Sequence, residues 1–211
     1  MSLVSKKIEK YCEKVSLSDN KLLKDLSKKT WQDEEIPQML SGPLVGGILH
    51  FLVKIAKVKN VLEVGMFTGY STLKIAEALP DDGEVHSCEL MEKHVKTATN
   101  WFNKSDVGYK IKVYQGQAIT TLESFQIGSF DMLFIDADKI HYPEYYKIGT
   151  ALLKTGGIGV LDNMLWNAEV LEPKSDNAKA LRETAELIKN NDRLEPLLLP
   201  VRDGVMIFRK K

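Results

Sequence analysis

The sequence predicts an α/β fold in which helices cover both faces of a mostly parallel sheet. From Asn60 onward, short apolar runs alternate with helical patterns, which is typical of successive parallel strands joined by helical crossovers. The chain then closes with two strand-like runs around the turn Arg202-Asp203-Gly204, which predicts an antiparallel hairpin. At 211 residues the chain suits one domain, with N-terminal helices over 1–57 and the α/β core over 58–211.

The local pattern predicts the elements in order. Three helical segments are expected between about residues 4 and 57; Asp19 is expected to cap the second, and Pro43 suits the first turn of the third. Strands are expected at 61–64, 84–88, 111–114, 130–135, 157–161, 194–199 and 204–209. Helices are expected between them at 70–79, 92–103, 118–124, 143–153 and 176–190.

The composition argues against two classes of function, nucleic-acid binding and membrane association. The 29 basic and 29 acidic residues balance, which argues against a dedicated nucleic-acid binder. No apolar run approaches the ~20 residues that span a bilayer and no signal-peptide core is evident, so we expect no membrane association. Cys12 and Cys88 lie far apart and are interpreted as reduced packing residues, which favours a cytoplasmic location. The sequence leaves open whether Met1-Ser2-Leu3 is native.

The most informative stretch is a strand that leads into a glycine loop and a helix, Val61-Leu62-Glu63-Val64-Gly65-Met66-Phe67-Thr68-Gly69-Tyr70-Ser71. The two glycines permit a tight turn and a close approach of the backbone to a ligand. Thr68 or Ser71 is expected to cap the helix. Glu89, at the end of the next strand, suits hydrogen bonds from both hydroxyls of a ribose, so we predict a nucleoside-type cofactor.

The loop favours a cofactor without phosphates. Dinucleotide sites use a third glycine to make room for the pyrophosphate, and here Met66 and Phe67 stand in that place. Glu63 also brings negative charge close to the loop, unless it is a surface carboxylate at the strand end. A positively charged, phosphate-free cofactor, S-adenosylmethionine, therefore fits better than the dinucleotide of a dehydrogenase.

Polar side chains also follow two later strands. Asp136, Asp138 and Lys139 come after the strand at 130–135, and Asp162-Asn163 follow the strand at 157–161. Successive parallel strands usually lie side by side, so Asp136 and Asp162-Asn163 are expected to converge. Oxygen ligands without His or Cys suit a hard cation, Mg²⁺ first and Mn²⁺ or Ca²⁺ as alternatives. Without a metal, the same residues form a plain turn and a helix cap.

Together these motifs resemble the cation-dependent S-adenosylmethionine O-methyltransferases, which include catechol and caffeoyl-CoA O-methyltransferases and small bacterial relatives. The resemblance extends from about Ser41 to the C-terminus. It rests on four segments: Leu62 to Ser71, Ile135 to Lys139 with Tyr142 and Tyr145, Asp162 to Asn167, and Pro200 to Val205. It implies a Rossmann-like methyltransferase fold with a seven-stranded sheet and a C-terminal antiparallel hairpin.

The resemblance also implies residue roles. The implied metal ligands are Asp136, Asp162 and Asn163. The implied cofactor contacts are Ser41, Glu63, Gly65, Met66, Ser71, Glu89, Ala118 and Asp138. Lys139 is expected as the general base beside Asp136, with Asn167 as a substrate contact and Trp166 as either a wall of the substrate slot or a core residue. A homodimer is expected from the resemblance and from the apolar N-terminal and third helices.

The expected reaction is divalent-cation-dependent methyl transfer from S-adenosylmethionine to a hydroxyl of a catechol-like or other vicinal-hydroxyl small molecule. Two alternatives stay open: methylation of a hydroxyuridine in transfer RNA, and a non-catalytic S-adenosylmethionine-binding module, which Lys139 and the metal set oppose. The chain departs from the family pattern at Leu44-Val45-Gly46-Gly47, and its N-terminal region does not match the plant substrate-binding segment. A bulky CoA ester is therefore not expected as substrate.

Overall fold

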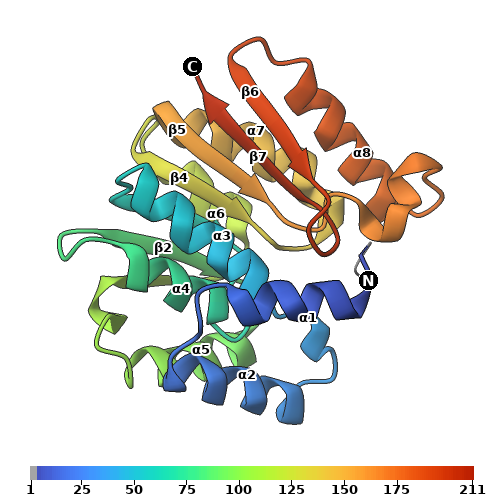
Figure 1. Ribbon diagram of the computed structural model, residues 1–211. Coiled ribbons are helices and arrows are strands. Elements are labelled where there is room, and N and C mark those ends of the chain that lie inside the picture. The colour runs from blue at the N-terminus through green and yellow to red at the C-terminus, as the bar shows by residue number, and fades with distance from the viewer. Residues whose placement is uncertain (1–3) are drawn as a thin grey trace.

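A seven-stranded sheet lies between two layers of helices in the computed structural model, which describes residues 4–211 (Figure 1). Met1-Ser2-Leu3 lie outside the described residues. The strand order is β3-β2-β1-β4-β5-β7-β6; the first five strands run parallel, and β7 pairs antiparallel with β5 and β6. The strands are β1 (Asn60–Val64), β2 (Glu84–Glu89), β3 (Ile111–Gln115), β4 (Phe130–Ile135), β5 (Leu153–Leu161), β6 (Leu194–Leu199) and β7 (Val205–Lys210). The predicted fold class is confirmed.

The helices pack on both faces of the sheet, with α3 in front of it and α6 and α7 behind it in Figure 1. The α-helices are α1 (Lys6–Val15), α2 (Lys21–Asp33), α3 (Gly42–Ile55), α4 (Tyr70–Ala78), α5 (Glu92–Phe102), α6 (Ala118–Glu123), α7 (Tyr142–Leu152) and α8 (Asp176–Lys189). Short 3-10 turns are η1 (Pro37–Met39), η2 (Gly108–Lys110), η3 (Lys139–His141) and η4 (Trp166–Leu171). This arrangement brings the carboxyl ends of β1, β2, β4 and β5 to one edge, where ligands bind in open α/β sheets.

Strand β5 begins earlier than the sequence predicts, at Leu153 rather than at residue 157. Its pairing with β4 passes from Phe130–Leu153 directly to Met132–Ile158, so the residues between bulge out of the ladder. Gly156 has a φ of 84°, which explains how the chain bends there without ending the strand.

The N-terminal cap of α2 is Asn20 rather than Asp19. The Asn20 side chain accepts a hydrogen bond from the Leu23 N–H at 2.9 Å. Asp19 instead accepts hydrogen bonds from Tyr70 Oη at 2.7 Å and from Lys74 Nζ at 3.1 Å. Lys74 is 1% exposed, and a buried ammonium group needs such a partner. The segment between α1 and α2 is therefore tied to α4.

Helix α4 is not capped by Thr68 or Ser71. Its N-cap residue is Gly69, which has a φ of 92° and needs glycine for that reason. Thr68 Oγ1 lies 2.9 Å from Thr30 Oγ1 of α2, and Ser71 bonds to Glu63. Both hydroxyls that the sequence predicts as helix caps bond instead to residues of other elements.

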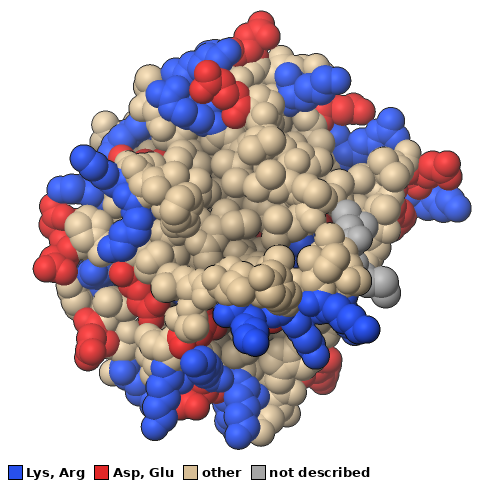
Figure 2. Space-filling model, in the orientation of Figure 1, with Lys and Arg blue, Asp and Glu red and all other residues tan. Residues whose placement is uncertain are grey.

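One helical stretch, Pro37–Ile55, is long and apolar enough to cross a membrane, which contradicts the expectation that no apolar run approaches that length. It spans 19 residues with a mean hydropathy of 1.3 and is 33% buried. One face of α3 packs against the sheet through Val45, Leu49 and Val53. A helix with an apolar face in the core can be as long and as apolar as a membrane span. Figure 2 shows that the middle of the face over α3 is largely uncharged, with charged side chains around its margin.

Candidate active site

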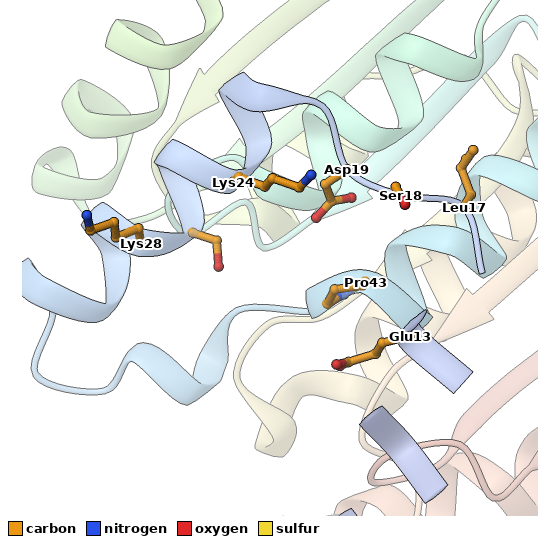
Figure 3. A pocket seen from close by; sticks show the side chains of 8 residues that line it. Glu13, Leu17, Ser18, Asp19, Lys24, Lys28 and Pro43 are labelled. Atoms are coloured by element: carbon orange, nitrogen blue, oxygen red, sulfur yellow. The ribbon is translucent and has the colours of Figure 1, made fainter. Parts of the chain in front are cut away.

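A cavity of about 860 Å³ opens at the carboxyl edge of the parallel strands. All of the predicted site residues except Glu63 and Ala118 line it. A second crevice, of about 410 Å³, lies among α1, α2 and the start of α3 and is lined by Glu13, Asp19 and Lys24, among others (Figure 3). None of the predicted site residues lines this crevice, so the cavity at the sheet edge is the candidate active site.

The glycine loop lies directly on the end of β4. Gly65 has a φ of 93°, and a Cβ there would lie 2.2 Å from the backbone oxygen of Asp136. No other residue fits such a contact without displacing the backbone. The loop is held by hydrogen bonds from Gly65 N to Cys88 O at 3.0 Å and from Gly69 N to Met66 O at 2.9 Å.

Glu89 braces this loop from the end of β2. One carboxylate oxygen accepts hydrogen bonds from Phe67 N at 2.8 Å and Met66 N at 3.3 Å, and the other accepts from Met91 N at 2.9 Å. Each oxygen of a carboxylate has two lone-pair sites, so these bonds leave acceptor capacity on the oxygen that Met91 contacts. The loop and the carboxylate form one unit.

Glu63 is neither a surface carboxylate nor part of the cavity wall. It is fully buried and accepts hydrogen bonds from Ser71 Oγ at 2.6 Å, from Thr72 Oγ1 at 2.5 Å and from Ser87 Oγ. Burial raises the pKa of Glu63 to about 7, although the three hydrogen bonds act in the opposite direction. Its side chain therefore holds Ser71 of the cavity wall from behind rather than facing the cavity.

Ala118 also lies away from the cavity. It is the first residue of α6 and packs against the hydrophobic core that α7 shares with the sheet. Its side chain therefore contributes to packing.

Asp136, Lys139 and Tyr142 meet at the end of β4. Lys139 Nζ donates hydrogen bonds to Asp136 Oδ1 at 3.0 Å and to Tyr142 Oη at 2.7 Å, and Lys139 is only 8% exposed. Tyr142 Oη in turn lies 3.0 Å from the backbone oxygen of Asp162. Ser41 Oγ donates to the second oxygen of Asp136 at 3.4 Å. Lys139 is thus a positioned group and not a lysine of a helix surface.

Asp162 lies beside Asp136 and is 2% exposed. Its Oδ1 accepts a hydrogen bond from the N–H of Asn163 at 2.8 Å. Burial and the neighbouring charge of Asp136 raise the pKa of Asp162 to about 7, despite the opposing charges of Arg202 and Lys139. Within residues 4–211, no group of three or more His, Cys, Asp and Glu is arranged to hold a metal. The predicted set consists of two carboxylates and one amide.

Asp138 lines the same cavity. It accepts hydrogen bonds from Tyr145 Oη at 2.7 Å and from His141. Burial raises the pKa of Asp138, but these two hydrogen bonds outweigh it and hold that pKa below its usual value.

Trp166 and Asn167 also line the cavity. Trp166 lines the cavity and also packs against the hydrophobic core, so both of its expected roles apply. The Asn167 N–H donates to Asp203 Oδ1 at 2.6 Å. Trp166 and Asn167 have φ values of 44° and 53°, in the left-handed region.

Several cavity residues were not predicted as site residues. Trp31, Met39 and His94 carried no motif signal, whereas Arg202 and Asp203 lie in the predicted closing hairpin and gave a signal that sequence reasoning did not use. The spacing of the motifs predicted which edge of the sheet forms the site. It did not predict that the N-terminal helices and the last turn also contribute to the cavity lining.

Comparisons with known proteins agree with this geometry. A model of the O-methyltransferase family matches residues 13–211. This chain belongs to the O-methyltransferase family.

Its relatives include caffeoyl-CoA O-methyltransferases. That of Stellaria longipes is 33% identical over 200 residues, which cover 89% of this chain and 83% of the relative. That of Petroselinum crispum is 35% identical over 178 residues, covering 78% and 74%.

Solved structures share the whole fold. An SAH-bound methyltransferase from Podospora anserina is 29% identical with a TM-score of 0.88, and covers 97% of this chain and 94% of its own. An O-methyltransferase from Bacillus cereus in complex with SAH is 26% identical with a TM-score of 0.89, and covers 97% of both chains. The predicted resemblance and the S-adenosylmethionine-dependent O-methyltransferase class of this enzyme are confirmed.

The buried Glu63 predicts a pH-dependent stability of this methyltransferase. Its pKa in the folded state, about 7, exceeds its ordinary value of 4.5, so the folded state binds the proton more tightly. That stabilisation is present below about pH 4.5 and is lost as the pH rises through about 7. Glu63→Gln has no carboxyl group to titrate and lacks this pH-dependent stabilisation. Relative to the wild type, its free energy of unfolding should rise by roughly 1–3 kcal/mol between pH 5 and pH 8, measured by urea denaturation.

Glu183→Gln is the control, because Glu183 is exposed on α8. Its stability should follow the wild-type pH profile. Parallel profiles for the wild type and Glu63→Gln would contradict the assignment.

Proposed function

We propose that this enzyme transfers the methyl group of S-adenosylmethionine to a hydroxyl of a catechol-like small molecule, with the help of a divalent cation. The observation that carries the proposal is one buried corner of the cavity. There Asp136, Asp162 and Lys139 gather beside the glycine loop, so a cofactor, a cation and a proton acceptor have adjoining places.

The cofactor would lie along the glycine loop, with its ribose hydroxyls on Glu89. Glu89 ends β2, lines the cavity and retains acceptor capacity on one carboxylate oxygen. Gly65 and Met66 offer a close backbone approach, and Leu90, Met91 and His94 add an apolar and aromatic wall for an adenine ring. The SAH bound in the Podospora and Bacillus structures supports the same class of cofactor.

The residues at the ends of β4 and β5 fit a divalent cation. Asp136 and Asp162 are close enough for the charge of one to raise the pKa of the other, and Asp162 is almost completely buried. Such a pair is costly unless a positive charge compensates it. Asn163 would supply a third oxygen, and a set of oxygen ligands suits Mg²⁺, or else Mn²⁺ or Ca²⁺. A bound cation lowers the pKa of an acceptor hydroxyl and holds two adjacent hydroxyls at once.

Lys139 is the residue placed to take the acceptor proton. Its bonds to Asp136 and Tyr142 hold Nζ at the cavity wall, and its low exposure restricts water around it. Trp166 offers a flat wall for an aromatic ring, and Asn167 offers a polar contact beside it. Holding the hydroxyl in line with the methyl group is the other main contribution expected of these residues.

The charges of the cavity favour an acceptor without phosphates. Its acidic lining residues are Glu9, Glu89, Asp136, Asp138, Asp162 and Asp203. The two Lys and Arg side chains of that lining are already engaged, Lys139 with Asp136 and Tyr142, and Arg202 with the backbone oxygens of Leu40 and Ser41. A CoA ester, as named for the plant relatives, or transfer RNA would bring phosphates without a free cation to meet them.

We also propose a homodimer in the cytoplasm. Five large apolar side chains on α1 and α3 are more than half exposed: Ile8, Tyr11, Val15, Phe51 and Ile55. A second copy of the chain would remove this surface from water, and the uncharged centre of the face in Figure 2 is consistent with such a contact. Cys12 and Cys88 are free thiols, which suits a reducing compartment.

A labelled-methyl transfer assay tests the proposed reaction. Purified enzyme with S-adenosylmethionine should label a catechol from a panel of phenols, should lose that activity in excess EDTA and should regain it with Mg²⁺. Deproteinised transfer RNA should stay unlabelled. Full activity in EDTA would remove the cation from the reaction, and preferential labelling of transfer RNA would favour the nucleoside alternative.

Glu89→Ala should weaken S-adenosylmethionine binding. Loss of hydrogen bonds to a charged group costs about 1.5–3 kcal/mol, or roughly 10- to 150-fold in affinity. Isothermal titration calorimetry measures it, and Glu84→Ala at the other end of the same strand should bind as the wild type does. An unchanged affinity of Glu89→Ala would exclude the ribose contact.

Lys139→Met should lower kcat by about 10²–10⁴-fold, the usual contribution of a positioned base, while the affinity for S-adenosylmethionine stays within about twofold. The loss should shrink for catechols whose hydroxyls are more acidic, because they need less help to lose the proton. Lys147→Met, at an exposed position of α7, is the control. A defect confined to KM for every acceptor would instead make Lys139 an orienting charge.

Light scattering should give twice the 23.8 kDa mass of the chain. Phe51→Glu places a charge in the exposed apolar face of α3 and should yield monomers, whereas Ile127→Glu, at a 75% exposed position outside α1 and α3, should not. A wild-type monomer at micromolar concentration would refute the dimer.

A further inference from the structure

Asp203 lies at the tip of the β6–β7 hairpin and is 7% exposed. Its carboxylate Oδ1 accepts the hydrogen bond from Asn167 N at 2.6 Å, and its backbone oxygen accepts one from Leu165 N at 2.8 Å. The next residue, Gly204, accepts from Met164 N at 2.9 Å through its backbone oxygen. The turn of the hairpin therefore pairs with most of the backbone N–H groups of residues 164–167.

The segment that these bonds hold has an unusual backbone. Asn163, Trp166, Asn167 and Ala168 have φ values of 60°, 44°, 53° and 67°. Residues other than glycine adopt this left-handed region at an energetic cost and keep it only where surrounding contacts impose it. Since Asn163, Trp166 and Asn167 line the cavity, the strained conformation is also what presents them there.

The same turn also contacts another segment of the cavity lining through Arg202. Its guanidinium donates to the backbone oxygen of Leu40 at 2.9 Å and to that of Ser41, and Ser41 Oγ bonds to Asp136. Figure 1 shows the turn between β6 and β7 close to the N-terminal end of α3. Two adjacent residues of one turn thus hold two separate segments of the cavity lining.

We propose that Asp203 is a positioning residue for the methyl acceptor. Its carboxylate holds residues 163–168 in their strained conformation and so sets Asn163, Trp166 and Asn167 at the acceptor end of the cavity. The role in acceptor binding rests on the proposed function, because that function assigns the acceptor to this end. The cofactor end is held separately, by Glu89 and by the contact of Gly65 with Asp136.

Two substitutions separate the hydrogen bond from the charge. Asp203→Ala leaves the Asn167 N–H without its acceptor, whereas Asp203→Asn keeps a side-chain oxygen in the same place. Hydrogen exchange followed by mass spectrometry, on the enzyme without acceptor, should show about tenfold or greater acceleration across residues 163–168 in Asp203→Ala. Exchange in Asp203→Asn should stay within about threefold of the wild type. Residues 65–71 should exchange alike in all three proteins.

Kinetics with catechol and S-adenosylmethionine provide the second readout. Asp203→Ala should raise KM for catechol about tenfold or more, Asp203→Asn should restore most of it, and the affinity for S-adenosylmethionine by calorimetry should change less than twofold. Asp192→Ala, at an exposed position before β6, is the control and should match the wild type in every readout. Asp203→Ser, which is too short to reach Asn167, replaces the alanine variant if that protein does not fold.

The two readouts distinguish the two hypotheses. Local exchange that accelerates as expected in an enzyme that does not methylate catechol would refute the proposed acceptor and leave the positioning role standing. Wild-type exchange at 163–168 in Asp203→Ala would overturn the positioning role. So would an asparagine variant as impaired as the alanine variant, or a loss of protection that extends equally to residues 65–71.

Discussion

The structure depends on one contact, in which the backbone of Gly65 rests against the backbone oxygen of Asp136. Any side chain at position 65 would separate the end of β1 from the end of β4, and with them the cofactor loop from the residue that begins the catalytic corner. Glu89 closes the loop from one side, while Tyr142 ties Ile135 and Asp162 together from the other. In the proposed reaction a methyl donor and an acceptor hydroxyl must come within bonding distance, and this contact sets how close their binding sites lie.

The same corner concentrates negative charge. Asp162 is 2% exposed, the Asp136 side chain beside it is 13% exposed, and Lys139 is the ammonium group bonded to Asp136. The cavity therefore favours positive charge, which the sulfonium of S-adenosylmethionine and the proposed divalent cation would both supply. It follows that binding of the cofactor and of the cation should each relieve part of the same electrostatic repulsion.

The sequence predicts most of the fold and most of the residues that line the site, but only part of how their side chains are arranged. Buried strands and their helices have strong periodic signals, and glycines or carboxylates directly after such strands must lie at the carboxyl edge of a parallel sheet. The direction of each side chain at that edge has no such signal. Glu63 illustrates this, because the parallel register places it opposite Ser87 and the turn of α4 brings Ser71 and Thr72 over it. Asp19, Arg202 and Asp203 likewise find partners more than 30 residues away, which spacing along the chain does not reveal.

The ion pair between Asp19 and Lys74 has a consequence for how the enzyme could be shortened. The recognised motifs all lie beyond Ser41, so a trimmed protein that starts after Asn20 would keep every one of them. It would also keep a lysine that is 1% exposed and has lost its carboxylate, one turn after the start of the helix that follows the cofactor loop. An unpaired buried charge is among the most destabilising defects a fold can carry. The smallest autonomous unit of this enzyme is therefore larger than the part that its motifs mark, and the segment that carries Asp19 belongs to it.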